Sequence, residues 1–507
     1  MKKVFVLGIF IIFLFTLISC KKPELRKYET RAVWMSRFEY AQDKTPEESQ
    51  QYIKDTFQKF HNAGLNLVIF QVRGNGDAFY KSKYEPWSDL LSDRIGTDPG
   101  WDPLQFAIDE AHQYGMELHA WVNTFPAWKA ENPLPPESEP LHPILAHPEW
   151  VVCDSSGQLM HPEAGYITFS PGIREVQEHV QNVVMDIVDN YDVDGIHFDY
   201  IRYPEGSVNM GYSHDSVSVV RFQSEESNPQ KLGWEPWERE QVNLFVETVY
   251  NKITEAKPWV KVSAAVIGHH HDGVWNGYHS VFQDARRWMA TGKIDFIFTM
   301  TYTQINHPTA PYTTAINQWK SMQYLNRAIF PGIATYKVGR QYKIGEIWKQ
   351  VELVRNEGFK GMVFFSANSL LKLLDQLEEK YYPAMALCRP AEWKAGVSLV
   401  KPQEAQFELA GENIRISWRQ QNDVNQYVLY RSENIEDPKN IITILPGTKA
   451  SFELKNSGSG QTFFITAINR VGLESKPVLV TQQKITVDFE DRHAPASSSL
   501  TNDKILP

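Results

Sequence analysis

One short segment, Asp194 to Pro204 (DGIHFDYIRYP), brings an acid, a guanidinium and a phenol together after an apolar run. A parallel strand that is buried on both faces normally reads as a nearly continuous run of apolar residues. Asp199, Arg202 and Tyr203 interrupt that run at its C-terminal end, where parallel barrels carry their active sites. We therefore take Asp199 as the first candidate for a catalytic carboxylate.

The chemistry that Asp199 suits best is hydrolysis of a glycosidic bond. This reaction uses two carboxyl groups roughly 5 to 10 Å apart, one to protonate the leaving oxygen and one to attack the sugar or activate water. We assign Asp199 the second role. Alternation along the strand places it on one face with His197 and Gly195. The alternative is a buried structural Asp199 that caps a loop or pairs with Arg202.

The partner acid is less well defined by the sequence. Candidates on loops after predicted strands are Asp77, Glu163, Glu205 and Asp272. We favour Asp272 because it follows the fifth predicted strand, where related barrels often carry their acid. Each of the four could equally be an ordinary exposed loop carboxylate.

Polar and aromatic residues at the ends of other strands predict substrate binding. Arginine and asparagine donate forked hydrogen bonds to sugar oxygens, and tryptophan offers a flat stacking face. The predicted substrate-binding residues are Arg73, His119, Trp121, Asn123, His197, Arg202, Tyr302 and Tyr336. The alternative for each is a place in an internal polar network.

The run His269-His270-His271-Asp272 could suggest a metal site. Adjacent residues of an extended segment point to opposite faces, so consecutive histidines rarely converge on one ion. We expect neither a metal nor a cofactor.

From Thr30 to about Ala367, short β-branched runs alternate with segments of helical periodicity, as in repeated βα units on a parallel sheet. The predicted strands are residues 31–35, 65–72, 117–122, 195–201, 260–267, 296–301, 328–334 and 362–365. The clearest predicted helices are residues 46–63, 103–114, 174–190 and 345–356. Eight such units favour a closed (β/α)8 (TIM) barrel over residues 30–390.

One connection in this region is long and rich in proline, from Thr124 to about Phe169. Long loops without regular structure are usually functional. Because this loop follows a strand, we expect it at the catalytic face, with Trp128 and Trp150 walling a groove.

After Pro390 the pattern changes to short alternating strands separated by turn residues, which indicates a small all-β sandwich. The segments IRISW (414–418), YVLYR (427–431) and TFFITAIN (462–469) resemble a fibronectin type III domain, of immunoglobulin-like fold, over residues 395–485. We expect residues 486–507 to form a flexible tail.

The charge balance narrows the range of partners. With 51 basic and 61 acidic residues the net charge is −10, which offers no footprint for nucleic acid. A neutral polymer such as a polysaccharide suits this balance, and 15 Trp and 22 Tyr provide faces that could stack on sugars.

The N-terminal 20 residues read as a targeting segment: two lysines, an apolar run, then Leu17-Ile18-Ser19-Cys20. This tetrapeptide resembles a bacterial lipobox, which implies that Cys20 is lipidated and that residues 21–29 form a tether. The protein would then be lipid-anchored in the cell envelope, in the periplasm or at the outer membrane. Plain secretion is the alternative. Whether Cys153 and Cys388 pair is open.

Three long motifs together resemble the bacterial glycosyl hydrolase-like 10 family. They are FQVRGNGDAFYKSKYEPWS (70–88), PGWDPLQFAIDEAHQYGMELHAWVN (99–123) and NYDVDGIHFDYIRYP (190–204). The resemblance implies a barrel that acts on a polysaccharide, and cell-wall glycans such as peptidoglycan strands without peptides as the substrate. The last motif departs from that of chitinase-type barrels at His197 and Ile201, so their mechanism is not implied.

Two main hypotheses for the function follow from the sequence. The first is a membrane-anchored glycoside hydrolase that uses Asp199 and a second carboxyl group. The second is a non-catalytic glycan-binding lipoprotein on a degenerate barrel, since a fold alone does not imply catalysis. A transglycosylase or lyase acting on the same polymer is a third, weaker option.

Overall fold

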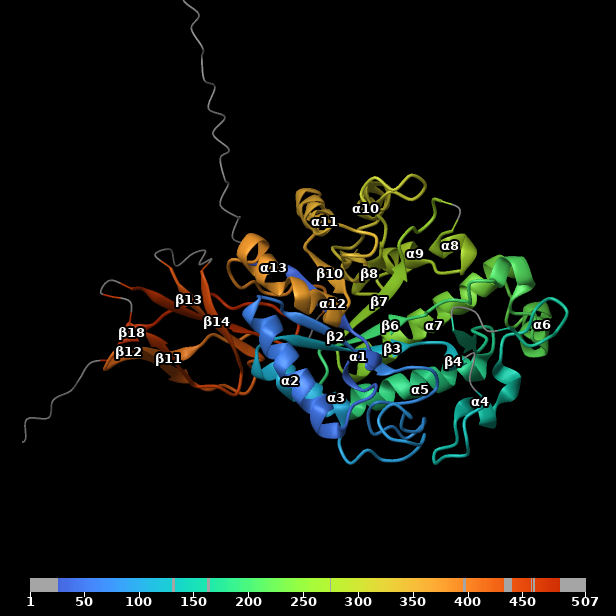
Figure 1. Ribbon diagram of the computed structural model, residues 1–507, viewed down its shortest axis with the longest axis horizontal. Helices are drawn as coiled ribbons and strands as arrows, with labels where there is room; N and C mark the ends of the chain where they lie inside the picture. Colours follow the sequence, from blue (N-terminus) through green and yellow to red (C-terminus); the bar gives the residue numbers. More distant parts are fainter. Residues whose placement is uncertain are drawn as a thin grey trace, which may run out of the picture.

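The computed structural model (Figure 1) describes residues 26–483 except 130–132, 162–164, 274, 395–397, 433–439, 457 and 459–460. The predicted signal segment with Cys20, residues 21–25 of the tether, Glu163 and the predicted tail lie outside the described residues.

Eight parallel strands close into a barrel in the order β1-β10-β9-β8-β7-β6-β3-β2, so each strand pairs with its neighbours along the chain. The strands are β1 (Thr30–Met35), β2 (Leu67–Arg73), β3 (Glu117–Asn123), β6 (Gly195–Asp199), β7 (Lys261–Ile267), β8 (Phe296–Met300), β9 (Ala328–Ala334) and β10 (Gly361–Phe365). The predicted (β/α)8 barrel is confirmed, with strand ends within two residues of those predicted.

Helices cover the outside of the barrel (Figure 1). The longer ones are α2 (Pro46–Asn62), α3 (Pro103–Gln113), α5 (Arg174–Asn190), α6 (Ser216–Gln223), α7 (Trp234–Ala256), α9 (Ala285–Ala290), α10 (Tyr312–Lys320), α11 (Ile344–Asn356) and α13 (Leu374–Tyr381). Single turns form α1 (Arg37–Tyr40), α4 (Pro143–Ala146), α8 (Gly277–Ser280) and α12 (Ala367–Leu370).

Local signals explain where helices begin. In α2, Thr45 accepts a hydrogen bond from the Glu48 amide while the Glu48 side chain accepts one from the Thr45 amide. This capping box, with Pro46 at the first helical position, fixes the start of the helix. Among the helices in the described part of the chain, none carries an apolar stretch sufficient to span a lipid bilayer.

Alternation along the strands divides the apolar residues into two layers. One set fills the barrel interior and includes Trp34, Trp121, Phe298 and Phe330. The residues of opposite parity pack between the strands and the helices. This division is what a strand period of two requires when both faces are buried.

The C-terminal part is a sandwich of two four-stranded sheets, in the orders β15-β12-β11-β18 and β14-β13-β16-β17. The strands are β11 (Gln403–Ala410), β12 (Asn413–Arg419), β13 (Gln426–Arg431), β14 (Ile441–Pro446), β15 (Ser451–Lys455), β16 (Phe463–Ile468), β17 (Val478–Leu479) and β18 (Thr481–Gln482). The predicted all-β character is confirmed, whereas membership of the fibronectin type III class stays a prediction.

The sandwich packs on the end of the barrel where the strands begin (Figure 1). Along β13, Tyr427 and Leu429 face the sandwich core, whereas Val428 and Tyr430 face Tyr28 and Leu387 of the barrel side. The junction also holds Tyr28, whose hydroxyl donates to Glu474 at 2.8 Å. The opposite end of the barrel, where the strands finish, is left for the loops.

The long Pro-rich connection has some structure of its own. Its antiparallel strands β4 (Pro126–Lys129) and β5 (Tyr166–Thr168) pair with each other. Trp128 and Trp150 are buried inside this loop, against His142 and Phe169. Our expectation that these two tryptophans wall a groove is therefore wrong: their rings form the core of the loop.

Gly195 is required by close packing in the barrel interior. A Cβ at this position would lie 2.7 Å from Nε2 of the buried His119 ring. We expect Gly195→Ala to lower the free energy of unfolding by about 1 to 3 kcal/mol, measured by urea denaturation. Gly345→Ala, in α11 with nothing within 4 Å of the new methyl group, is the matched control and should unfold at or slightly above the wild-type midpoint. Equal stability of the two variants would contradict the packing argument.

Candidate active site

A cavity of about 280 Å³ opens where the barrel strands end. Seven aromatic residues and six polar or charged residues make most of its wall. Its lining residues are Trp34, Ser36, Arg37, Phe38, Gln71, Trp121, Asn123, Tyr166, Asp199, Tyr200, Arg202, Ala265, Met300, Tyr302 and Phe365. Four of the predicted substrate-binding residues (Trp121, Asn123, Arg202 and Tyr302) and the predicted catalytic Asp199 are thus brought together.

Asp199 is the last residue of β6, in register with Asn123 of β3. Its carboxylate accepts a hydrogen bond from the Tyr200 amide at 2.7 Å and lies 3.6 Å from a nitrogen of Arg202. Burial raises the pKa of this carboxyl group above its usual value, although the charge of Arg202 acts in the opposite direction. Asp199 is 7% exposed, so it meets only what enters the cavity.

The backbone immediately after Asp199 is strained. Tyr200 has φ of +50°, in the left-handed region that residues with a side chain rarely adopt. Such a conformation costs about 1 to 3 kcal/mol and persists where the surroundings hold it. The amide of the same residue donates to the Asp199 carboxylate, a contact that fixes the direction of the acid.

Asn123 is oriented by two neighbours. Its Oδ1 accepts hydrogen bonds from Trp121 Nε1 at 2.9 Å and from Gln71 Nε2 at 3.1 Å. Gln71 is held in turn by the Arg37 amide, which donates to its Oε1 at 3.0 Å. The two donors fix the oxygen of Asn123, so its Nδ2 is left as a donor for a sugar oxygen.

His197 and His119 lie deeper in the barrel and do not line the cavity, which corrects their prediction as substrate-binding residues. Each precedes a residue of the cavity layer by two positions, a drop of roughly 7 Å along a strand. His197 Nε2 accepts from Trp34 Nε1 at 3.0 Å, and its Nδ1 lies 3.0 Å from Ser263 Oγ. Burial lowers the pKa of His197 far below its ordinary value, so the ring is neutral. It supports Trp34 from below.

Arg73 is also removed from the cavity, and the cause is a bulge in β2. Gln71 pairs with Trp121, but Arg73 pairs with Val122, so one extra residue stands in β2. The bulge reverses the alternation and turns Arg73 towards the helix layer. There its guanidinium holds both oxygens of Glu85, at 2.6 and 2.8 Å, and it is fully buried. Arg73 is a structural residue.

Tyr302 and Tyr336 follow β8 and β9 as predicted, but only Tyr302 reaches the cavity. Tyr302 stacks on Phe365 with 5.8 Å between ring centroids, and Tyr336 packs edge-on behind both rings. Burial and the charge of Asp199 raise the pKa of Tyr302 well above its usual value. Tyr302 therefore stays protonated and can donate a hydrogen bond.

The structure distinguishes among the candidates for the second carboxyl group. Asp272 is exposed on the loop after β7 and Asp77 is buried beside Asn75, and neither lines the cavity. Glu205 lines a small hollow that shares Tyr166, Tyr200 and Arg202 with the cavity. Of the described candidates, Glu205 is therefore the one whose hollow shares residues with the cavity of Asp199.

Comparison with known protein families identifies the family of this chain. The model of the family described as "Glycosyl hydrolase-like 10" matches residues 29–350, more than half of the chain. The chain belongs to the glycosyl hydrolase-like 10 family. Its general activity is thereby of the glycoside hydrolase type, which agrees with the barrel and the carboxylate-bearing cavity described above.

Two similar proteins are also named glycosyl hydrolases. The chain is 28% identical over 489 residues to glycosyl hydrolase YngK of Bacillus subtilis, covering 88% of this chain and 92% of the relative. It is 30% identical over 317 residues to glycosyl hydrolase DigH of Escherichia coli, covering 59% of this chain and 69% of the relative. The glycoside hydrolase domain of PgaB from Bordetella bronchiseptica matches with a TM-score of 0.49 and 13% identity, over 71% of this chain and all of that domain.

Several cavity residues of this family member were not predicted: Trp34, Ser36, Arg37, Phe38, Tyr166, Tyr200, Ala265, Met300 and Phe365. Some of these residues could have been found from the sequence. Trp34 and Phe365 lie at the C-terminal ends of predicted strands, and side-chain alternation places them inside the barrel with Trp121. Tyr166 carried none, because it comes from the long loop and approaches the cavity only after that loop has folded.

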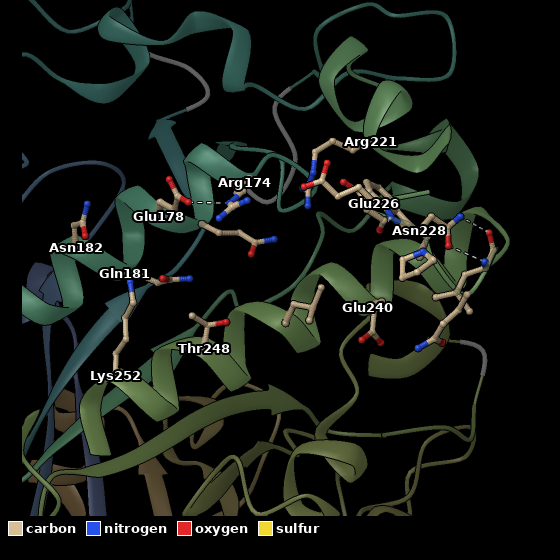
Figure 2. A pocket seen from close by; sticks show the side chains of 17 residues that line it. Arg174, Glu178, Gln181, Asn182, Arg221, Glu226, Asn228, Glu240, Thr248 and Lys252 are labelled. Carbon is tan, nitrogen blue, oxygen red and sulfur yellow. Dashed lines mark hydrogen bonds and ion pairs between the residues drawn. The ribbon is translucent and has the colours of Figure 1, made fainter. Parts of the chain in front are cut away.

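A larger groove of about 760 Å³ lies on the outside of the barrel, between α5, α7 and the segment after α6 (Figure 2). Its lining includes exposed polar residues such as Arg174, Glu178 and Asn182. No residue predicted to act on substrate lies there, and we place the active site in the smaller cavity because Asp199 is found in it.

The histidine run does not converge. His270 packs against Trp319, and His271 stacks on Tyr278. Within the described ranges, no group of three or more His, Cys, Asp or Glu side chains could hold a metal ion. Cys153 and Cys388 are both free thiols, so the open question of their pairing is answered in the negative.

The buried pair of Arg73 and Glu85 should control stability at low pH. Burial would raise the pKa of Glu85, but Arg73 and His179 together lower it to about 2. The stabilisation is thus present above about pH 4.5, the ordinary value, and is lost as the pH falls towards 2. We expect Glu85→Gln to lose about 3 to 5 kcal/mol at pH 7 and to show a flatter loss of stability between pH 4.5 and 2 than wild type. Denaturant unfolding across that range measures both effects, and an unchanged acid profile in Glu85→Gln would contradict them.

Proposed function

We propose that this protein hydrolyses glycosidic bonds of a polysaccharide, with Asp199 as nucleophile or general base and peptide-free peptidoglycan strands as the substrate. The observation that carries the proposal is the Asp199 carboxylate, fixed by the Tyr200 amide at the base of an aromatic-walled cavity. Aromatic faces suit the apolar faces of sugar rings, and Asn123, Arg202 and Tyr302 supply donors for hydroxyl groups. The choice of peptidoglycan rests on the family resemblance.

We propose Glu205 as the partner acid in place of Asp272. Its position is the argument: it follows Asp199 by six residues on the same loop and borders a hollow continuous with the cavity residues Tyr200 and Arg202. A loop carboxylate in this place can move towards a bound sugar, which a catalytic acid must reach.

A glycan-binding protein without catalysis is the second candidate. The observation that favours it is the count of acids: among the described residues that line the cavity, Asp199 is the single carboxylate. A hydrolase needs a second carboxyl group to reach the substrate in the cavity, whereas a binding protein needs no catalytic carboxyl group.

The predicted lipid anchor fits the orientation of the barrel. Residues 27–29 lie at the end where the strands begin, beside the sandwich, with Tyr28 bridged to Leu387. Cys20 precedes Arg26 by six residues, a reach of roughly 20 Å at full extension. A chain anchored through Cys20 in the cell envelope would hold this end near the bilayer and present the cavity on the far side.

The two functions predict different behaviour of an Asp199→Asn variant. For a hydrolase, we expect wild type to release reducing ends from peptide-free peptidoglycan strands and Asp199→Asn to lose at least about 1,000-fold in kcat, with binding of the strands retained. Glu205→Gln should also lose most activity, and Asp272→Asn, exposed and outside the cavity, is the matched control that should keep it. Wild type that binds strands but releases no reducing ends would establish the binding protein instead.

The pH dependence of the reaction should report the environment of Asp199. A nucleophile or base must be ionised, and the pKa of Asp199 is raised by burial. As the pH is lowered, activity should therefore be lost at a pH above the ordinary pKa range of an aspartate. An active Asp199→Glu variant should shift the pH at which this loss occurs. The profile of kcat/KM against pH measures it; an acid limb below pH 4 would contradict the proposed ionised role.

A further inference from the structure

Arg37 is a buried guanidinium in the cavity wall that no described carboxylate neutralises. It is 1% exposed and follows β1 directly, in the single turn α1. Its Nη2 donates to Asn75 Oδ1 at 3.2 Å and to the Tyr166 hydroxyl at 3.1 Å, and both acceptors are neutral. Its Nε is buried without a hydrogen-bond partner.

The acids near Arg37 make no hydrogen bond to its guanidinium. Glu39 accepts from the Ser36 amide through one oxygen and from Ser366 and Asn368 through the other. Asp77 accepts from the Asn75 amide through Oδ1, and its Oδ2 is buried without a partner. Asp77 lies near Arg37, because a Cβ on Gly74 would lie 2.8 Å from both Arg37 Nε and Asp77 Oδ1. It offsets part of the charge at a distance but makes no hydrogen bond to the guanidinium.

The remaining charges of the cavity leave it positive. Asp199 is close to Arg202, and no other acid lines the cavity in the described part of the chain. Arg37 therefore adds a positive charge that Asp77 offsets only in part, and the ring of Phe38, 4.3 Å from the guanidinium carbon, makes a cation–π contact with it. A buried guanidinium without an ion-pair partner is costly, so such an arginine indicates that an anion binds there.

We infer that Arg37 is a specificity-determining residue that binds the carboxylate of an acidic sugar. The inference rests on the proposed function, because the ligand is a unit of the polysaccharide cut beside Asp199. Guanidinium and carboxylate match in planar geometry and charge. Such a carboxylate is found on a lactyl ether side chain or as the C6 carboxyl group of a uronic acid, and both present the same group to Arg37.

The test compares substrates that differ in the carboxylate alone. Peptide-free peptidoglycan strands carry lactyl carboxylates, a polyuronic acid carries C6 carboxylates, and chemical reduction converts either to the corresponding alcohol without altering the backbone. We expect wild type to favour one acidic polymer over its reduced form by about 10- to 100-fold in kcat/KM, the contribution of a charge-assisted hydrogen bond. The polymer that shows the preference identifies the source of the carboxylate.

Arg37→Gln removes the charge but can still donate to Asn75 or Tyr166. We expect it to lose that 10- to 100-fold on the acidic polymer, mainly through KM, and to lose much less on the reduced polymer. Arg37→Lys should restore part of the preference, because the charge remains. Arg174→Gln is the matched control: Arg174 is exposed in the outer groove of Figure 2 and paired with Glu178 at 2.9 Å, so it should behave as wild type on both polymers.

Two results would overturn the inference. One is wild type that does not distinguish acidic from reduced polymer, and the other is Arg37→Gln that weakens both equally, which would indicate a packing role. If wild type cleaves no polymer, the proposed function fails, and affinity electrophoresis on gels containing the same acidic and reduced polymers decides the inference separately. Retardation that depends on both the carboxylate and Arg37 supports it, and retardation independent of either refutes it.

Discussion

The alternation of side chains between the inside and the outside of a closed barrel is the constraint on which the rest of this molecule depends. Each strand is buried on both faces, so every residue is committed either to the interior or to the helix layer. Closure also fixes the height of each interior residue, because neighbouring strands are in register. Asn123 and Asp199 meet at the top for this reason, while His119 lies opposite Gly195 four residues lower.

The interior beneath the cavity is polar in places, yet it is arranged so that no net charge is needed there. Trp34 donates to His197, and Ser263 completes the contact on the other side of the ring. A neutral imidazole can accept on one nitrogen and donate from the other, whereas a charged one could not accept from Trp34. The low pKa of His197 is thus part of what holds Trp34 upright in the cavity wall.

Much of the fold could be predicted from the sequence because period and length were unambiguous. The eight barrel strands and the helices at residues 46–62, 103–113, 174–190 and 344–356 follow directly from hydrophobic periodicity. In the sandwich, the alternating segments at residues 414–418, 427–431, 451–454 and 462–469 predict β12, β13, β15 and β16. Strand β11, which lies between β12 and the short β18, has the sequence QEAQFELA and is largely exposed, so it carries no clear apolar alternation.

The site was predictable only where alternation is regular and the strand end is near. Parity places Asp199 and Trp121 correctly. It fails for Arg73, because a bulge is a property of strand pairing and leaves no mark in a single sequence. It also fails for His119 and His197, where parity gives the face but not the depth. Tyr166 and Glu205 depend on how loops return to the barrel, which hydrophobic patterns do not encode.

The two ends of the barrel are used for different purposes, and the chemistry of each end explains why. Where the strands begin, the sandwich covers the barrel with apolar residues and with Glu474, which binds Tyr28 and Lys27. Where they finish, the chain places strained backbone at Tyr200, a buried carboxylate and a buried arginine without an ion-pair partner, all of which reduce stability. Packing at the first end can offset that cost without occupying the cavity, so attachment and chemistry do not compete for the same surface.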